Sequence, residues 1–542
     1  MAVHIGDPSS NQASSLESQP IPPIQYVPGQ TLSSWVFIGG VLGWLGGRRG
    51  IQDMSGPIWL GKMRFCLFGA IFLAANVIAL TGANASIAIS SASTQNMTCS
   101  SGVCSPTQSS AVLNVTDLEN MLATGSVTVT TTGSGVQADD IVVDDAFHWA
   151  GTNGLSLDAW QWITIDKPVT VEGLGAVSLT TDDGGTGGEL SFGRKGHITF
   201  QNLSSPLTID GTAFLLVNSV ASLASAVDAN PDGAYALASA YDASGDGTYT
   251  SSPVQATFAG IFDGLGNTIS NLSMENGLSQ NRLGLFGIST GVIENVGLLH
   301  VSVAGAKKGQ DAVGIIVGVS NGDLTGDFAT GSIRVQGSNG SVGGLAGVAI
   351  NINRSHADVT IHGGKAAYEQ AGGLAGFFDD GALGESYATG AIMVGNSGIA
   401  GGLVGMNFDS DIQNSYATGA VAGGSSARIG GLIGEEKKFS GLFQTVQTSY
   451  STGAVSAGMS SFVGGFIGTS NSESRYTDAY WDTMSSGTYQ PTGKGKARGV
   501  EGLTTEQFQS DLPEGFDPAI WGEKPGINGG LPYLLNNPPP KK

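Results

Sequence analysis

The sequence predicts a right-handed parallel β-helix, an all-β solenoid in which the short strands of successive coils stack on one another. The first observation is a pentapeptide that returns at a nearly constant spacing: Gly-Gly, an aliphatic residue or Phe, one small or apolar residue, and Gly. Its copies begin at Gly343, Gly372, Gly401, Gly430 and Gly464, so three of the four steps are 29 residues long and the last is 34. A period of this kind is typical of one structural unit stacked repeatedly.

A second pattern follows the pentapeptide, in the forms LGESYATGAI from Leu383, IQNSYATGAV from Ile412 and TSYSTGAV from Thr448. Glycine makes up 85 of the 542 residues, which strongly disfavours the helices of a helical repeat. Each repeat is therefore expected to hold about three short strands, and stacked coils rise about 4.8 Å each. Glycine is expected at the corners, where positive φ and close approach exclude other residues.

The N-terminal region contains the parts of a secretory signal peptide. An uncharged apolar run, 65–80, follows basic Lys62 and Arg64 and precedes Ala-Asn-Ala at 83–85. We expect a signal peptide over 63–85 with cleavage between Ala85 and Ser86, while 1–62 would be a mis-called or extended N-terminus. A retained membrane anchor is the alternative, although 16 residues are short for a span of roughly 20.

Residues 86–109 are rich in Ser, Thr and Asn and are expected to form a linker or a poorly ordered start. Of the three cysteines, Cys66 would leave with the signal peptide, and Cys99 and Cys104 remain. In an exported protein this close pair is expected to form a small surface disulfide.

The remainder of the chain divides into three parts. Residues 110–282 are expected to form an N-terminal β-helix part, because Val, Thr and Ile alternate there with period two. An Ala-rich insertion at 215–240 favours a short helix or two. The repeats occupy 283–470, and 471–542 form a C-terminal cap and tail with a short helix that has Thr504 as its N-cap. The Ala-rich insertion and the tail are the candidate caps of the solenoid.

Composition and charge exclude several classes of partner. The formal net charge is −21, and an acidic surface repels nucleic acid and anionic lipid, so no nucleic-acid partner is expected. An apolar content of 40% favours a packed core over disorder in spite of the glycine.

The sequence predicts no catalytic or cofactor site. It has no HExxH zinc motif, and its six histidines are scattered. Asp242 and Asp246 are weak candidates for Ca²⁺ ligands, and a solvated turn is the alternative. Asp182-Asp183 lies near Arg194-Lys195, a combination that keeps a carbohydrate-active β-helix enzyme, such as a polysaccharide lyase, as an alternative function.

One position of the second pattern forms an aromatic column from coil to coil. Its members are Phe328, His356, Tyr387, Tyr416 and Tyr450. If these side chains face outward, they form a stripe that could hold a sugar chain, helped by neighbouring Asn and Ser. Ile412, Asn414 and Tyr416 share parity, however, and Ile412 is expected to be buried. This favours a column that points into the core.

The pairing of GGLVG with SYATG resembles the GLUG-motif repeats. The end of such arrays is similar to Tyr480-Trp481-Asp482 together with Gly502-Leu503-Thr504. The part that usually precedes such arrays is similar to the segment from Phe262 to Leu272. The resemblance covers about 255–535. It implies a bacterial surface or secreted protein similar to filamentous haemagglutinin-like adhesins, while the same motif also occurs outside the catalytic part of IgA-specific zinc metallopeptidases.

The chain lacks the Asn-Pro-Asn motifs of adhesins that a partner transporter exports, and it ends in Pro-Pro-Pro-Lys-Lys rather than in the strands of an autotransporter barrel. The export route and any dedicated export partner are therefore left open.

The predicted function is that of an exported, adhesin-like protein without catalytic activity. It would present an extended surface to a protein or glycan on a host cell, a neighbouring cell or a matrix. The alternatives are the carbohydrate-active enzyme named above and a structural spacer whose functional module lies on another polypeptide.

Overall fold

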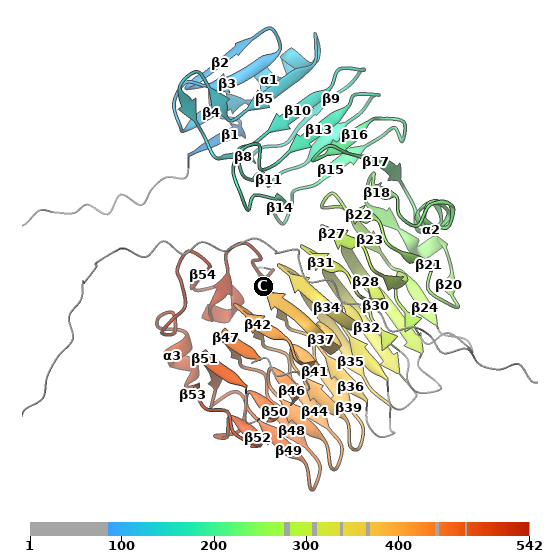
Figure 1. Ribbon diagram of the computed structural model, residues 1–542, viewed down its shortest axis with the longest axis vertical. Coiled ribbons are helices and arrows are strands. Elements are labelled where there is room, and N and C mark those ends of the chain that lie inside the picture. The colour runs from blue at the N-terminus through green and yellow to red at the C-terminus, as the bar shows by residue number, and fades with distance from the viewer. Residues whose placement is uncertain are drawn as a thin grey trace, which may run out of the picture. The chain divides into compact units, whose positions relative to one another are not determined.

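The structure is a computed structural model that describes residues 85–275, 282–305, 312–335, 340–364, 369–438, 444–471 and 474–540. It is about 50% β-strand and forms a parallel β-solenoid of about 13 turns with coils of about 29 residues (Figure 1). The predicted fold class is thus confirmed. Residues 1–84, which include most of the predicted signal peptide, lie outside the described residues.

The first part of the solenoid is built on a core of its own, with Ile87, Ile141 and Val171 among its buried residues. Its strands are β1 (Ser86–Ser90), β2 (Met97–Ser100), β3 (Val103–Pro106), β4 (Ala111–Asn114), β5 (Val127–Thr130), β6 (Thr132–Gly133), β7 (Val136–Gln137), β8 (Asp140–Val143), β9 (Phe147–Trp149), β10 (Leu155–Asp158), β11 (Ile163–Ile165), β12 (Val169–Val171), β13 (Val177–Thr180), β14 (Leu190–Phe192), β15 (Ile198–Phe200) and β16 (Leu207–Ile209). Helix α1 (Val115–Leu122) follows β4 and has Asn114 as its N-cap.

The expectation of a linker at 86–109 is wrong. β1 lies between β4 and β8 in a parallel sheet, and its residues Ile87 and Ile89 are completely buried. β2 and β3 form an antiparallel hairpin whose second strand pairs with β5. Ser and Thr dominate this stretch because they occupy outward positions, so composition concealed the alternation that defines the strands.

A transition follows in which β17 (Thr212–Val217) leads to the Ala-rich helix α2 (Val220–Ala229). This confirms a helix in the insertion. Val220, Leu223 and Val227 of α2 are buried in a second core, which α2 covers at its start. The strands that follow α2 are β18 (Ala234–Leu237), β19 (Tyr241–Asp242), β20 (Thr248–Tyr249), β21 (Val254–Phe258), β22 (Ile261–Asp263), β23 (Thr268–Ser270) and β24 (Ser273–Glu275).

The repeats stack in columns of parallel strands, coloured from green to orange in Figure 1. The first column is β25 (Arg282–Leu283), β29 (Ala312–Val313), β33 (Ser341–Gly343), β36 (Gln370–Gly372), β40 (Ile399–Gly401), β45 (Arg428–Gly430) and β49 (Phe462–Gly464). The second is β26 (Phe286–Ser289), β30 (Val317–Ser320), β34 (Ala346–Asn353), β37 (Ala375–Gly384), β41 (Val404–Phe408), β46 (Ile433–Lys437), β50 (Ile467–Thr469) and β52 (Thr492–Lys494).

The third column is β27 (Val292–Glu294), β31 (Asp323–Thr325), the ends of β34 and β37, β42 (Asp411–Gln413), and the starts of β47 (Thr445–Ser451) and β51 (Arg475–Asp482). The remaining strands are β28 (Gly297–Gly305), β32 (Phe328–Val335), β35 (His356–His362), β38 (Tyr387–Ala388), β39 (Ile392–Val394), β43 (Tyr416–Ala417), β44 (Val421–Gly423), β48 (Val455–Ala457) and β53 (Val500–Leu503).

The pentapeptide glycines are required by close approach rather than by positive φ. A Cβ added to Gly372 would lie 2.0 Å from the carbonyl oxygen of Ala375, and one on Gly373 would lie 2.2 Å from that of Gly402 in the next coil. Neither residue is among those with positive φ. The expected role of φ > 0 at these glycines is therefore wrong, whereas the expected clash is correct.

Another corner, just before the SYATG-type pattern, does adopt the left-handed conformation, mostly with residues other than glycine. These are Asn295 (φ 55°), Arg354 (46°), Glu385 (43°), Asn414 (47°), Thr448 (46°) and Asp478 (50°). Asn accommodates this region well, but a β-branched Thr is strained there. The corner matters because it reverses the side to which the following side chains point.

The chain ends with a C-terminal segment, residues 504–540, coloured red in Figure 1. It contains α3 (Thr505–Phe508), whose N-cap is Thr504 as predicted, and the antiparallel pair β54 (Trp521–Gly522) and β55 (Tyr533–Leu534). Phe508, Phe516 and Trp521 are buried in a third cluster, separate from the two cores.

Candidate binding surface

The aromatic column exists as a continuous stack of rings. Each member pairs in register with the next, and Tyr450 pairs in turn with Tyr480. The centroids are 5.2 Å apart for Phe328 and His356, then 4.7, 4.8 and 5.0 Å along the rest of the column, with interplanar angles of 4–6°. The stacking follows from the strand spacing, which sets the distance between equivalent side chains.

The column lies on the outer side of the coils, so the interpretation of an inward column is wrong. Ala388 and Ala417, each next to a column Tyr, are buried in the second core, and adjacent strand residues point to opposite faces. The parity count failed because Asn414, between Ile412 and Tyr416, has positive φ and interrupts the alternation.

Although the rings face outward, the C-terminal segment covers most of them. Tyr387, Tyr416 and Tyr450 are no more than 1% exposed, while Phe328 and His356 at the other end are half-buried. Trp521 packs against both Tyr416 and Tyr450, at 6.0 and 5.9 Å. The chain's own tail therefore occupies the position at which the sequence predicted a possible ligand stripe.

Polar contacts fix this segment in place. The hydroxyl of Tyr450 donates to Pro532 O at 2.6 Å and accepts from Asn528 Nδ2 at 2.9 Å. Trp521 Nε1 lies 3.3 Å from Asn414 Oδ1, and Tyr480 donates to Glu514 O at 3.0 Å. Burial raises the pKa of the Tyr416 and Tyr450 hydroxyls, so both stay neutral.

A serine precedes four of the five column residues and has a structural role. The backbone N–H of Ser355 donates to Ser386 Oγ, Ser386 N–H to Ser415 Oγ, and Ser415 N–H to Ser449 Oγ, over 3.0–3.3 Å. Each hydroxyl donates to the carbonyl two residues earlier, at 2.6–2.9 Å. These serines are completely buried and form a serine ladder, so they are not available to a sugar chain.

An exposed polar surface runs along the third column of strands. In each of seven coils a buried apolar residue is flanked by two outward residues. The buried residues are Ile293, Leu324, Ile352, Leu383, Ile412, Val446 and Tyr476. The outward residues, hereafter the polar face, are Val292, Glu294, Asp323, Thr325, Asn351, Asn353, Ala382, Gly384, Asp411, Gln413, Thr445, Gln447, Arg475 and Thr477.

Neighbouring coils tie parts of the polar face together. Asn351 Nδ2 donates to Asp323 Oδ1 at 2.8 Å, and Thr445 donates to Asp411 Oδ1 through both its backbone N–H and its hydroxyl. Asp323, Asp411 and Gln413 are exposed. Most coils of the face thus offer amide, carboxylate or hydroxyl groups, which suit hydroxyl-rich ligands, while one coil contributes only Ala382 and Gly384. Sequence reasoning missed it, although the polar residues on either side of Ile412 were a readable signal.

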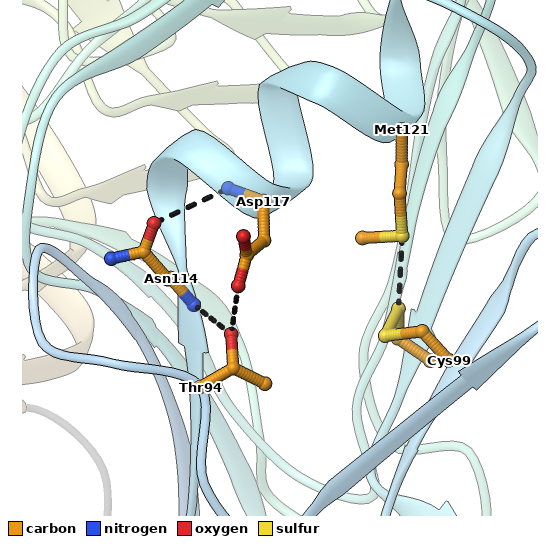
Figure 2. The surroundings of a disulfide bond; sticks show 6 residues. Thr94, Cys99, Asn114, Asp117 and Met121 are labelled. Atoms are coloured by element: carbon orange, nitrogen blue, oxygen red, sulfur yellow. Dashed lines mark hydrogen bonds between the residues drawn. A yellow bond between two sulfur atoms is a disulfide. The ribbon is translucent and has the colours of Figure 1, made fainter.

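The structure joins Cys99 and Cys104 in a disulfide across the β2–β3 hairpin. Figure 2 shows α1 beside it, with Met121 Sδ 3.9 Å from Cys104 Sγ. Thr94 contacts the start of the same helix: its hydroxyl donates to Asp117 at 2.5 Å and accepts from the backbone N–H of the N-cap Asn114 at 3.0 Å. β3 of the cross-linked hairpin thereby covers the edge of β5, and the mostly exposed β2 lies outside it.

The candidate Ca²⁺ ligands are engaged by internal donors. Asp242 Oδ1 accepts from Ser244 N and from Asn271 Nδ2, at 3.0 and 2.9 Å. Asp246 accepts from the hydroxyls of Tyr241 and Tyr249, at 2.5 and 2.7 Å. The two carboxylates therefore bind parts of the chain, and among the described residues no group of three or more His, Cys, Asp or Glu could hold a metal ion.

The acidic turn at Asp182 is likewise held by the backbone. Asp182 accepts from the N–H groups of Gly187 and Gly188, at 3.1 and 2.7 Å. Nearby in sequence to this turn, Glu189 forms an ion pair with Arg354 of the repeats, whose guanidinium lies over Trp162 at 5.1 Å. Within the described ranges, none of the helices combines the length and apolar character that crossing a membrane requires.

No family model matches the chain. Halomucin of Haloquadratum walsbyi is 30% identical over 244 residues, which is 44% of this chain and 2% of halomucin, so the chain spans a small fraction of that relative.

Two solved structures are similar in fold. A putative immunoglobulin A1 protease from Bacteroides ovatus gives a TM-score of 0.38 at 19% identity, covering 60% of this chain and 92% of that structure. An IgA1 protease gives 0.36 at 18% identity, covering 57% and 25% respectively.

Proposed function

We propose that the protein is an exported, adhesin-like β-solenoid without catalytic activity, whose polar face binds a glycan or a protein on another surface. The observation that carries this proposal is the polar face itself, which repeats the same outward geometry over seven coils. A repeating array lets many weak contacts act together on an extended ligand.

The chemistry of the face favours a hydroxyl-rich ligand. Amide side chains both donate and accept, and carboxylates accept, which matches the alternating hydroxyls of a sugar chain. Asp323, Asp411 and Gln413 are exposed, and the net charge of −21 disfavours anionic polymers. The resemblance to GLUG-motif proteins and the mucin-like name of one relative agree with a role at a cell surface.

Two features support export. The first strand that the structure describes, β1, begins at Ser86, immediately after the proposed cleavage position at Ala85. The Cys99–Cys104 disulfide suits an oxidising compartment. The proposed location is the cell surface or the medium, reached through the predicted signal peptide, with the need for a dedicated export partner left open.

The test is binding of the purified full chain to an array of immobilised glycans and to intact cells. The double variant Gln413→Ala/Gln447→Ala removes two stacked amides of the polar face. It should weaken binding about 30-fold, because each of the two lost hydrogen bonds is worth about 1 kcal/mol.

Ser302→Ala/Ser332→Ala is the matched control, since these residues are also in register on neighbouring coils but lie in another column. Unchanged binding by the Gln variant would contradict the proposed face. Turnover of a bound glycan would favour the enzyme alternative.

A further inference from the structure

The two cores of the solenoid meet at a joint formed by residues 263–267. Leu265 belongs to the first core, while Phe262 belongs to the second. Asn267 Nδ2 donates to Ile198 O and Leu237 O, at 2.8 and 3.0 Å, and Ile198 N donates to Leu265 O at 3.0 Å. The five-residue turn is thus hydrogen-bonded to strand β15 of the first part.

A buried carboxyl shapes this turn. Asp263 Oδ1 accepts from Leu265 N at 2.7 Å and from Asn295 Nδ2 at 3.4 Å. Asp263 is 1% exposed, and its Oδ2 has no hydrogen-bond partner. An ionised carboxylate left in this state is costly, whereas a neutral carboxyl is tolerated.

A second buried carboxyl stands at the head of the serine ladder. Asp327 occupies the position of the ladder serine in the coil before Ser355. Its backbone N–H donates to Ser355 Oγ at 3.0 Å, and its Oδ1 accepts from Val296 N at 3.1 Å. On the other rungs a hydroxyl proton also reaches a carbonyl two residues earlier. Asp327 makes no such bond, and its inaccessible Oδ2 has no partner, which is more costly for an ionised carboxylate than for a neutral carboxyl.

Other acids surround these two. Glu294 is in register with Asp263, and Asp210 and Asp323 also act on Glu294. Burial is the main cause that raises the pKa of Asp263 to about 7, of Glu294 to about 8 and of Asp327 well above its usual value. The neighbouring charges that act on Glu294 and Asp327 are carboxylates.

We propose that this joint is a pH-sensitive contact, which is closed while Asp263 and Asp327 each hold a proton and loosens when they release it to solvent. Ionisation of both groups places two further negative charges beside the carboxyl of Glu294, inside the protein. The turn at 263–267 would then lose its hydrogen bonds to Ile198 of β15.

The direction of the pH effect follows from linkage. An acid whose pKa is higher in the closed state than in the open state favours closure at low pH. For Asp263 this preference declines as pH rises from about 4, the ordinary Asp pKa, towards about 7, and is then constant. Between pH 6 and 9 this single group should increase the open fraction about tenfold.

Hydrogen–deuterium exchange of the full chain tests the proposal. After correction for intrinsic base catalysis, amides of peptides spanning 196–200 and 261–268 should lose about tenfold in protection between pH 6 and 9. Amides of 177–180, within the first core, report global opening and should change less than twofold. Asp263→Asn and Asp327→Ser imitate the protonated states and keep the acceptors, and each should reduce the pH dependence of the joint.

Asp358→Asn is the matched control, because it removes one exposed carboxylate from β35 and should keep the wild-type pH profile. Two results would overturn the proposal: pH-independent protection of the joint in the wild-type chain, or an unreduced pH dependence in both Asp263→Asn and Asp327→Ser. Because the two variants are separate, misfolding of one leaves the other as a test.

Discussion

The imidazole of His356 and the side chain of Asn537 form a hydrogen bond across 181 residues of sequence, with Nδ1 2.9 Å from Oδ1. Asn537 Nδ2 donates to the carbonyl oxygens of Ser355 and Glu385, so Oδ1 is the acceptor and His356 Nδ1 carries the proton. Burial lowers the pKa of His356 to about 4 and keeps the ring neutral near pH 7. The tail is thus tied to the column that it covers.

The cover over the column should contribute substantially to stability. Trp521 is 1% exposed and contacts Tyr416, Tyr450 and Phe516. Trp521→Ala should lower the free energy of unfolding by about 3–5 kcal/mol, since it leaves a large cavity. Chemical denaturation measures the change, with exposed Tyr489→Ala as the control that should have no effect. Equal stability of the two variants would mean that the tail is only loosely docked.

The serine ladder should be sensitive to the loss of a single hydroxyl. Ser386→Ala removes the acceptor of Ser355 N and the donor to Gly384 O, both buried. An unsatisfied buried donor costs about 1–3 kcal/mol, so the melting temperature should fall clearly. Ser332→Ala, on an outward position, should melt like the wild type; a similar melting temperature for Ser386→Ala would show that the ladder is dispensable.

A substitution at the left-handed corner formed by Thr448 should increase the stability of the fold. Thr448 has φ 46°, which is strained for a β-branched residue, whereas Asn414 holds the equivalent corner of the preceding coil without that strain. Thr448→Asn should therefore stabilise the fold by about 1 kcal/mol, read from equilibrium unfolding. A destabilised Thr448→Asn would mean that contacts of the Thr methyl outweigh the backbone strain.

The cross-linked hairpin should protect the edge of the solenoid. β2 is the outermost strand on that side, and an open strand edge is a template for another chain. Cys99→Ser/Cys104→Ser should increase association of the protein, measured by sedimentation velocity over a range of concentrations. Cys104→Ser alone, which leaves a free thiol, should additionally give disulfide-linked dimers. If the double variant stays as monomeric as the wild type, the disulfide does not protect this edge against association.

The sequence was sufficient for the architecture because the period is a property of the whole array. The pentapeptide spacing, the helix in the Ala-rich insertion and Thr504 as an N-cap could all be read directly. The column could be found as well, since a repeat places equivalent residues in register.

Features that depend on one backbone angle or on distant contacts could not be read in this way. Asn414 at positive φ reversed the predicted direction of Tyr416, and the covering tail is more than 100 residues away from it, as the 107-residue separation of Asn414 and Trp521 illustrates. β1 was hidden for a similar reason, because its partners β4 and β8 follow it in sequence and its composition is that of a linker.

The central claim, an exported solenoid that acts at a surface, is tested most directly by fractionating the native host and sequencing the N-terminus of the protein. We expect a chain that begins at Ser86 and is found on the cell surface or in the medium. A chain that retains Met1 and remains in the inner membrane would contradict the claim. Residues 35–81, which include the apolar run at 65–80, would then be its anchor.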